Sequence, residues 1–523
     1  MKTIDPKELK IIHKLPPPSK KGDKVAFDSE FFHMEKARLH RPHGVLAFLG
    51  CTYDGETVYW IDDPEQVQEF FERIDKAVWI GHNLKFDINQ LRRWAKIPQR
   101  SLMWDTMLIE QIRFSGYYSD FGLNDLVRRY LGLYLSKDVR SEFAESDTLS
   151  SEQLGYSASD VAATWRVYKE QRSQIDENDL NIWRDIELPF LWVLLGMKGI
   201  RLDVNKWLAL AEKNEKTAQE IQAKYGEWQE VQGKRSVKKE FHGVNLNSPA
   251  QVKAHLKSCG WNVASTNAEE LEKIANTDDN DDAGVRFANE LLVYRTCAKR
   301  ASTYGKSFID DYVEADGRIY GDVFQMGAET GRTSSRNPNL QNQPHEFEYR
   351  DCFVAGDGNC IIVADWGSQE PRVAAYLSQD EGLIDALNSE EKLYIRIARD
   401  ALGISITKQS DEYTHIKSTI LGLFYGMSAF GLSKRIGVTP DEAQEMIDSI
   451  LAAYPGIAEY MRQQKRAKDF VQSIYGRKIW LNKYSYQWER NALNAPIQGS
   501  AADAMKIAAA RFVEVLAQIQ FVF

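Results

Sequence analysis

The stretch CIIVADWGSQEPRVAAYLS, residues 360–378, decides how the rest of the chain is interpreted. An apolar run rich in β-branched residues ends at Asp365, and Arg372 follows seven residues later. Short apolar runs of this kind are typical of buried strands. We therefore expect a strand that places the Asp365 carboxylate at its end. Carboxylates that bind cations act in groups, so the remaining acidic residues must be traced through the chain.

The bulk composition limits the classes of protein that fit. The 523-residue chain is too long for one hydrophobic core, and we expect three or more lobes. The net charge of −9 does not by itself indicate nucleic acid, although phosphate binding depends on local basic surface. Basic residues cluster at 233–243, 294–306 and 461–470, and we interpret each cluster taken alone as a solvated helix face.

Membranes and disulfides are not expected. No apolar run reaches the roughly 20 residues that cross a bilayer. Five scattered cysteines, without metal-finger spacing, indicate reduced thiols and a cytoplasmic location. Residues 1–23 predict a short arm that ends in a proline-rich linker.

The order of expected elements predicts an α/β multidomain protein. Residues 24–62 read as short strands, and helical patterns dominate from about 64 to 180. Long polar helices are expected over 185–310. A second β-rich region follows at 318–325 and 352–365, and helices then continue nearly to the end.

A first group of acids is spread over three segments. Asp28 and Glu30 are two apart on an expected strand, so their side chains share one face. Asp87 lies near the start of an expected helix, and Tyr156 and Asp160 share a helix face at i, i+4. Taken singly, each is a solvated acid, a helix cap or a surface pair. Four carboxylates together can hold two Mg²⁺-like ions, and a tyrosine hydroxyl can orient a water.

The motifs DSE (28–30), NLKFD (83–87) and YSASD (156–160) resemble those of the 3′–5′ exonucleases built on Asp-Glu-Asp-Asp and a Tyr. Ser29 stands where Thr is commoner. The resemblance implies a ribonuclease H-like domain that uses two Mg²⁺ ions, for which Mn²⁺ can substitute. It implies Asp28, Glu30, Asp87 and Asp160 as metal ligands, and Tyr156 as the residue that orients the attacking water.

Four later segments carry a second set of polar residues. They are ETGRTSSRNPNLQNQP (329–344), ADWGSQEPR (364–372), HIKSTILGLFYGMSAFGLSKRIG (415–437) and ERNALNAPIQGSAADAMK (489–506). Singly, the first is a polar loop and the third is an amphipathic core helix with an exposed Lys. In this order they resemble the polymerase module of family A DNA polymerases, the class of bacterial DNA polymerase I.

This resemblance implies a right-hand polymerase that adds dNTPs to a primer by two-metal phosphoryl transfer. Asp365 would bind both Mg²⁺ ions, and Lys417 would neutralise the triphosphate. Leu421 would lie beside the nucleotide, Tyr425 would stack on the base pair, and Glu370 would exclude a ribose 2′-hydroxyl. The residues implied to contact primer–template DNA are Arg332, Asn339, Gln341, Arg490, Asn494 and Gln498.

Three positions depart from the family pattern. Tyr413 stands where an Arg is usual, and Ile395 stands where a His is common. Leu421 replaces the Phe or Tyr that sets selectivity for the 3′-hydroxyl. We expect these changes to alter nucleotide binding and sugar discrimination.

The family's second metal-binding Asp lies in a His-Asp-Glu turn, and no His-Asp follows residue 500 in this sequence. We expect that a second polypeptide supplies it, that residues 521–523 begin the hairpin that leads to it, and that this chain alone polymerises poorly. A truncated gene is another explanation of the missing motif. The alternative is a 3′–5′ exonuclease whose polymerase half only binds DNA. A non-enzymatic DNA-binding scaffold is a third reading, disfavoured by the complete set of exonuclease acids.

Both resemblances imply a domain organisation for the chain. We also expect the host to be a bacterium or a phage-infected bacterial cell. The segments are an arm (1–23), the exonuclease domain (24–184), a connection into the palm (185–205), the thumb (206–305), the palm (306–384), the fingers (385–488) and an incomplete part of the palm (489–523).

Overall fold

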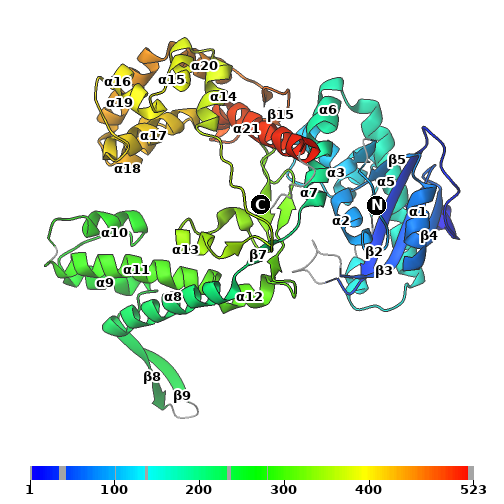
Figure 1. Cartoon of the computed structure of the whole chain (residues 1–523), viewed down its shortest axis with the longest axis horizontal. Coiled ribbons are helices and arrows are strands. Elements are labelled where there is room, and N and C mark those ends of the chain that lie inside the picture. Colours follow the sequence, from blue (N-terminus) through cyan, green and yellow to red (C-terminus); the bar gives the residue numbers. More distant parts are fainter. Residues whose placement is uncertain are drawn as a thin grey trace. The chain divides into compact units, whose positions relative to one another are not determined.

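The computed structural model describes residues 3–34, 43–99, 102–135, 139–232, 237–279 and 281–515. The chain divides into two compact units (Figure 1). The first contains residues 1–198, 321–341 and 363–523, and the second contains 199–320 and 342–362. In the described part of the chain, no helix has both the length and the apolar character needed to cross a membrane.

A six-stranded sheet organises the N-terminal part of the first unit. The strands are β1 (Lys10–His13), β2 (Lys24–Phe32), β3 (Val45–Thr52), β4 (Thr57–Ile61), β5 (Val78–Gly81) and β6 (Met103–Asp105), in the order β1-β4-β3-β2-β5-β6. The expected strands between 24 and 62 are confirmed. β5 and β6 lie inside the region read as mainly helical, because runs this short carry little periodic signal. β1 pairs with β4, so this part of the expected arm belongs to the sheet.

Helices pack on the sheet around β2. They are α1 (Val67–Arg73), α2 (Leu84–Leu91), α3 (Thr106–Phe114), α4 (Leu123–Leu131) and α5 (Ser151–Gln174), with short turns η1 (Pro6–Glu8), η3 (Pro64–Gln66) and η4 (Arg140–Ala144). Phe27 and Phe31 of β2 enter a core shared with α1 and α2. Small residues Ala158 and Ala162 of α5 pack on β3 and β4. The central strand is therefore buried between elements on both faces.

The rest of the first unit is mainly helical. It contains α6 (Glu177–Ile182), the π-helical turn η5 (Trp183–Glu187), α7 (Leu188–Gly196), β11 (Asp322–Phe324), β12 (Ser334–Arg336) and η6 (Leu340–Asn342). These are followed by α14 (Gln369–Ser378), α15 (Glu381–Asn388), α16 (Leu393–Leu402), α17 (Asp411–Phe424), α18 (Ala429–Ile436), α19 (Pro440–Ala453), α20 (Pro455–Gln464), β14 (Phe470–Gln472), β15 (Lys478–Trp480) and α21 (Trp488–Val515).

A fully buried charge cluster fixes α21 within this unit. Arg477 donates to Asp503 Oδ1 from Nε at 2.8 Å and also pairs with Glu187. Lys506 donates to Glu187 Oε1 at 2.6 Å, and all four side chains have 0% exposure. Two positive and two negative groups balance, which is the condition under which charges tolerate burial. The cluster joins η5, the β14–β15 hairpin and α21.

The second unit combines a small sheet with a helical subdomain. It contains β7 (Ile200–Leu202), α8 (Val204–Tyr225), β8 (Gly226–Gln232), β9 (Val237–Gly243), α9 (Pro249–Ser258), α10 (Ala268–Ala275), α11 (Ala283–Thr303), α12 (Lys306–Tyr312), β10 (Arg318–Ile319), α13 (Phe347–Arg350) and β13 (Phe353–Val354). The sheet order is β10-β7-β13, and apolar residues of α8, α9, α10 and α11 share one core.

The basic cluster at 233–243 is not a helix face, and that interpretation was wrong for its described part. Residues 237–243 form β9, which pairs with β8 in a hairpin that extends from the end of α8 (Figure 1). Gly226 and Gly243 face each other at its base with φ values of 158° and 110°. Glycine tolerates such φ values, so the chain can leave α8 at Gly226 and leave the hairpin at Gly243.

The prediction of a strand that ends at Asp365 was also wrong. Only β13, Phe353–Val354, is a strand, and residues 359–366 have no regular structure. Ile362 is 74% and Val363 is 85% exposed. A strand needs a hydrogen-bonded neighbour, and no strand in the described residues pairs with this segment. Residues 521–523, expected to start a further hairpin, lie outside the described residues.

Candidate functional site

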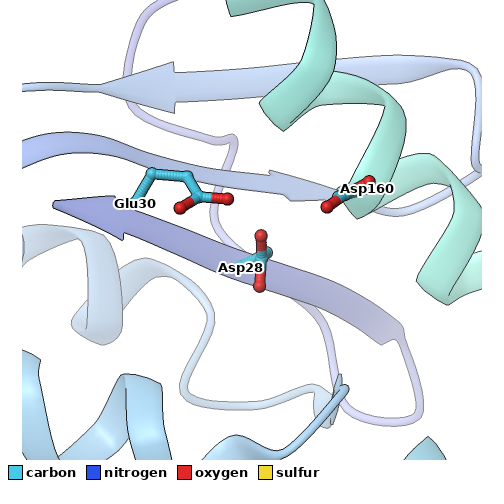
Figure 2. A group of neighbouring side chains, drawn as sticks. All are labelled: Asp28, Glu30 and Asp160. Atoms are coloured by element: carbon cyan, nitrogen blue, oxygen red, sulfur yellow. The ribbon is translucent and has the colours of Figure 1, made fainter. Parts of the chain in front are cut away.

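Three carboxylates from two elements converge beside the central sheet. Oxygen atoms of Asp28, Glu30 and Asp160 all lie within 4.8 Å of one another. Figure 2 shows the three side chains pointing toward a common space, Asp28 and Glu30 from β2 and Asp160 from α5. Like charges this close repel, and a cation is the simplest group that relieves the repulsion. All donors are oxygen atoms, which suits Mg²⁺ or Mn²⁺.

The local structure explains this convergence. Alternation along β2 sends Phe27 and Phe31 into the core with α2, and it turns Asp28 and Glu30 to the other face. The register between β2 and β3 shifts between Glu30 and Phe31. Such irregularities re-aim side chains and are common beside functional sites. Asp160 arrives from a long helix that begins with a capping box at Ser150.

Asp87, the fourth predicted ligand, is not part of that group, although its charge interacts with that of Asp28, and Ser29 holds it in place. Its Oδ1 accepts the Ser29 backbone N–H at 3.0 Å and the Ser29 hydroxyl at 2.5 Å. β5 pairs with β2 only as far as Ala26. The backbone N–H of Ser29 therefore makes no bond to β5 and can donate to Asp87 of α2. Burial and the Asp28 charge raise the pKa of Asp87 well above its usual value, and the Ser29 hydrogen bonds oppose that rise.

Asp105 is a positioning residue that the sequence analysis did not identify. Its carboxylate accepts four backbone N–H groups, from Asn83 and Leu84 at the start of α2 and from Met107 and Leu108 in α3. Burial raises its pKa, and these four donors oppose the rise. Asn83 has a left-handed φ of 61°, so the carboxylate stabilises the turn from which α2, the helix that carries Asp87, begins. An Asp directly after an apolar strand and before Thr106 was the available signal.

Tyr156 lies one helical turn before Asp160 on α5 and is half-buried. Its ring packs near Phe143, with centroids 6.4 Å apart, in a cluster that also contains Phe32 of β2. The helix spacing therefore places Tyr156 and Asp160 on the same side of the sheet as Asp28 and Glu30.

A second group of predicted residues meets between α14, α17 and α21. The Tyr425 hydroxyl lies 2.9 and 2.8 Å from the two Glu370 carboxylate oxygens. Arg332 forms an ion pair with Glu370, and the Gln498 side chain also hydrogen-bonds to Tyr425. Burial and the Glu370 carboxylate raise the pKa of Tyr425. Glu370 is therefore held from two sides.

Tyr425 is the C-cap of α17 and not part of the helix, while Lys417 and Leu421 are within it. Gly426 follows with φ 64°, and an added Cβ there would lie 3.0 Å from the Arg490 Cα. The glycine therefore lets α21 approach closely at this point.

The other predicted residues of the polymerase half have different surroundings. Gln341 donates its backbone N–H to Asn339 Oδ1 at 3.0 Å and its amide to the Thr333 hydroxyl at 2.8 Å. Arg490 is exposed and Asn494 is half-buried on α21. Asp365 and Lys417 are both exposed.

The departures from the family pattern have local partners. Tyr413 packs edge-on against Tyr394, with ring centroids 5.6 Å apart. Ile395 is half-buried on α16. Arg396 pairs with Asp385 at 2.9 Å and Arg399 pairs with Glu391 at 2.7 Å. Either arginine would have to break its ion pair to take the place of the Arg and His side chains that are usual at positions 413 and 395.

Comparisons with known proteins match both halves of the chain. Residues 210–521 match the model of DNA polymerase family A, and residues 8–176 match a 3′–5′ exonuclease model. DNA polymerase I of Pseudomonas aeruginosa is 31% identical over 466 residues, which is 82% of this chain and 49% of that protein. The Mycobacterium tuberculosis enzyme of the same name is 30% identical over 530 residues, 90% of this chain and 54% of that protein. The chain thus spans about half the length of the curated relatives it matches.

A solved structure has the same fold. The POL domain of Pol1 from M. smegmatis, in complex with DNA primer–template and dNTP, matches with a TM-score of 0.76 and 24% identity. The match covers 95% of this chain and 86% of that chain. The expected fold class, an exonuclease domain joined to a polymerase fold, is confirmed. The chain belongs to DNA polymerase family A.

Proposed function

We propose that the protein is a DNA-directed DNA polymerase with a 3′–5′ proofreading exonuclease. The observation that carries the proposal is the Asp28–Glu30–Asp160 group, within the region that matches the exonuclease model. The Arg332–Glu370–Tyr425–Gln498 group, within the region that matches family A, supports the polymerase half.

In the exonuclease half, Asp28, Glu30 and Asp160 would hold divalent cations, and Asp87 would complete the set. Bound Mg²⁺ would lower the pKa of a water and stabilise charge on the phosphodiester. Ser29 holds Asp87 through two hydrogen bonds, and Tyr156 would orient the attacking water. Asp105 keeps the turn before α2 in place.

In the polymerase half, Glu370 would exclude a ribose 2′-hydroxyl, held in position by Tyr425 and Arg332. Asp365 would hold Mg²⁺ and Lys417 would neutralise the triphosphate. Gln498, Asn494 and Arg490, spaced by one turn on α21, would contact the primer–template. The M. smegmatis structure contains primer–template and dNTP, which agrees with these substrates.

One experiment tests both halves on the same DNA. The full chain is incubated with Mg²⁺ and a 5′-labelled primer–template, with and without dNTPs. We expect Asp28→Asn to lower trimming by about 100-fold or more, because a metal site supplies several kcal/mol of transition-state stabilisation. Glu152→Gln, an exposed acid on α5, is the matched control and should trim normally. Trimming that survives Asp28→Asn would refute the exonuclease assignment.

The extension arm decides the polymerase half. Extension, measured with the chain alone and with candidate partner polypeptides added, should be lost in Asp365→Ala and kept in Asp28→Asn, because the two groups belong to separate sites. Extension that survives Asp365→Ala would refute the role given to that residue.

A second candidate function has one observation in its favour. Asp365 is exposed and residues 359–366 have no regular structure, so the polymerase half could bind DNA without extending it. Since this chain alone is expected to polymerise poorly, trimming without extension favours this alternative only if extension stays absent when candidate partner polypeptides are added. The partner polypeptide, the cytoplasmic location and the segment boundaries given above remain predictions. Native mass measurement of the complex tests the partner directly.

A further inference from the structure

Two tyrosines in one short turn are unusually exposed. Tyr484 is 101% and Tyr486 is 92% exposed, in the segment 482–487 between β15 and α21. Tyrosine rings carry a large apolar surface that is normally covered at least in part. Two uncovered rings two residues apart therefore indicate a surface that is covered by something outside the chain.

The turn that carries these rings is itself well ordered by hydrogen bonds. The backbone N–H of Tyr484 donates to Asn482 Oδ1 at 3.0 Å, and that of Ser485 donates to the Asn482 carbonyl at 3.0 Å. Gln487 donates its side-chain amide to the Tyr486 hydroxyl at 2.6 Å. Little ordering is thus needed before a flat ligand can stack on the rings.

The basic cluster at 461–470 lies against this turn. Lys483 pairs with Asp469 at 3.0 Å, Lys465 pairs with Glu489 at 3.5 Å, and the Leu481 N–H donates to the Asp469 carbonyl at 2.9 Å. The helix-face interpretation holds only for its first residues, because α20 ends at Gln464.

The charge on this combined surface opposes that of the whole chain. Residues 461–470 and 482–490 contain six basic and two acidic side chains, in a chain of net charge −9. Within the described part of the chain, Arg466 and Lys468 are exposed and take part in no ion pair within 4.0 Å. A positive surface beside exposed aromatic rings has the composition of a site for unpaired nucleic acid.

We propose that Tyr484 and Tyr486, with Arg466 and Lys468, bind single-stranded DNA. The bases stack on the two rings, and the cations neutralise the phosphates. Duplex DNA fits less well, because paired bases do not offer free faces to the rings. An acidic protein partner would satisfy the charges but does not require two flat rings. The proposal rests on the proposed function, in which the ligand is the unpaired template strand ahead of the primer.

Binding of a labelled oligo(dT) to the full chain tests this, by fluorescence anisotropy in EDTA so that no trimming occurs. We expect the pair Tyr484→Leu and Tyr486→Leu to weaken binding about 10-fold, the loss typical of removed base stacking. The pair Arg466→Gln and Lys468→Gln should lower the slope of log K against log salt by about one. Phe347→Leu removes another exposed ring, 77% exposed and on α13, and should bind as the wild type does.

A blunt primer–template in the same assay separates this inference from the proposed function. All variants should bind the blunt duplex within about twofold of the wild type. The inference alone would be overturned if the chain binds the duplex but does not bind oligo(dT), or if the tyrosine pair binds oligo(dT) as the wild type does. The surface would then be assigned to a protein partner. A wild-type chain that binds neither DNA would overturn both.

Discussion

Ser29 donates two hydrogen bonds to a single oxygen atom of Asp87, from its backbone N–H at 3.0 Å and from its hydroxyl at 2.5 Å. Ser29 is 3% and Asp87 is 2% exposed, so water does not replace either bond. The contact links the central strand to α2 across 58 residues of sequence. Because burial and Asp28 both raise the pKa of Asp87, these donors are what favours its ionised form.

The first prediction concerns the Ser29 hydroxyl. Ser29→Ala removes one of the two donors, and a hydrogen bond to a charged group contributes about 1.5–3 kcal/mol. We expect trimming of single-stranded DNA to fall roughly 10- to 100-fold. Ser29→Thr keeps the hydroxyl and should retain activity. Ser157→Ala, a buried serine that donates within α5, is the control, and equal losses in both alanine variants would contradict the prediction.

The carboxylate group should bind a divalent cation directly. Mn²⁺ binding to the full chain, followed by electron paramagnetic resonance without DNA, should weaken in Asp28→Asn and in Asp160→Asn, because each removes one charged oxygen donor. A loss of about 10-fold or more is expected. Glu152→Gln should bind as the wild type does. Unchanged Mn²⁺ affinity in both Asn variants would remove the basis of the proposed exonuclease.

The Tyr425–Glu370 pair should control the choice of sugar. Tyr425→Phe removes the hydroxyl that holds both Glu370 oxygens and leaves the ion pair with Arg332. We expect discrimination between dNTP and rNTP to fall roughly 10-fold, because a mobile Glu370 leaves room for a 2′-hydroxyl. Primer extension with each nucleotide measures the ratio, with Tyr376→Phe as the exposed control on α14. An unchanged ratio would argue against Glu370 as the excluding group.

The buried cluster around Glu187 should make a large contribution to stability. Glu187→Gln leaves Arg477 and Lys506 without one of their two counter-charges, which typically costs about 3–5 kcal/mol. We expect a clear fall in Tm by circular dichroism at neutral pH, and none for Glu177→Gln, an exposed acid in the first turn of α6. Equal Tm values for wild type and Glu187→Gln would show that the cluster is not stabilising.

The same cluster predicts a pH dependence. Burial alone would raise the pKa of Glu187, but Lys506 and Arg477 outweigh burial and hold the pKa below its usual value. The stabilisation is therefore complete above the unfolded-state pKa of about 4.3 and is lost as the pH falls through the folded-state pKa. The Tm difference between wild type and Glu187→Gln should shrink below about pH 4. A difference that stays constant down to pH 3 would contradict this.

Because Trp480 contacts residues 115 and 116, we expect that Gly116 cannot be replaced by a larger residue without a loss of stability. The backbone N–H of Trp480 donates to the Ser115 carbonyl at 2.9 Å. A Cβ added to Gly116 would collide with the backbone of Trp480. Gly116→Ala should lower the free energy of unfolding by about 1–3 kcal/mol, measured by urea denaturation. Gly132→Ala has a similar left-handed φ of 66° but open space around it, so it isolates the cost of the φ angle. Equal losses in the two variants would mean that the collision is relieved.

How much could be predicted differs between the two candidate sites. Asp28 and Glu30 follow from a strand with period two, and Tyr156 and Asp160 from a helix with spacing of four, so local periodicity was enough. Asp105 and Ser29 carry ordinary capping and strand signals, but the partners that connect them to α2, Leu84 and Asp87, lie 21 and 58 residues away. Their roles could not be predicted because no local pattern encodes a long-range hydrogen bond.

The sequence by itself determined the family and indicated the candidate acids of the exonuclease half. It also determined the segments that carry Glu370, Tyr425 and Gln498, because those motifs depend on residue type and short spacing. Only the tertiary structure decided that residues 360–365 are not a strand, that 237–243 belong to a hairpin, and that Arg477, Asp503, Glu187 and Lys506 form one buried cluster. The reason is physical: a strand and a buried charge are each stable only with a partner, and that partner comes from a distant part of the chain.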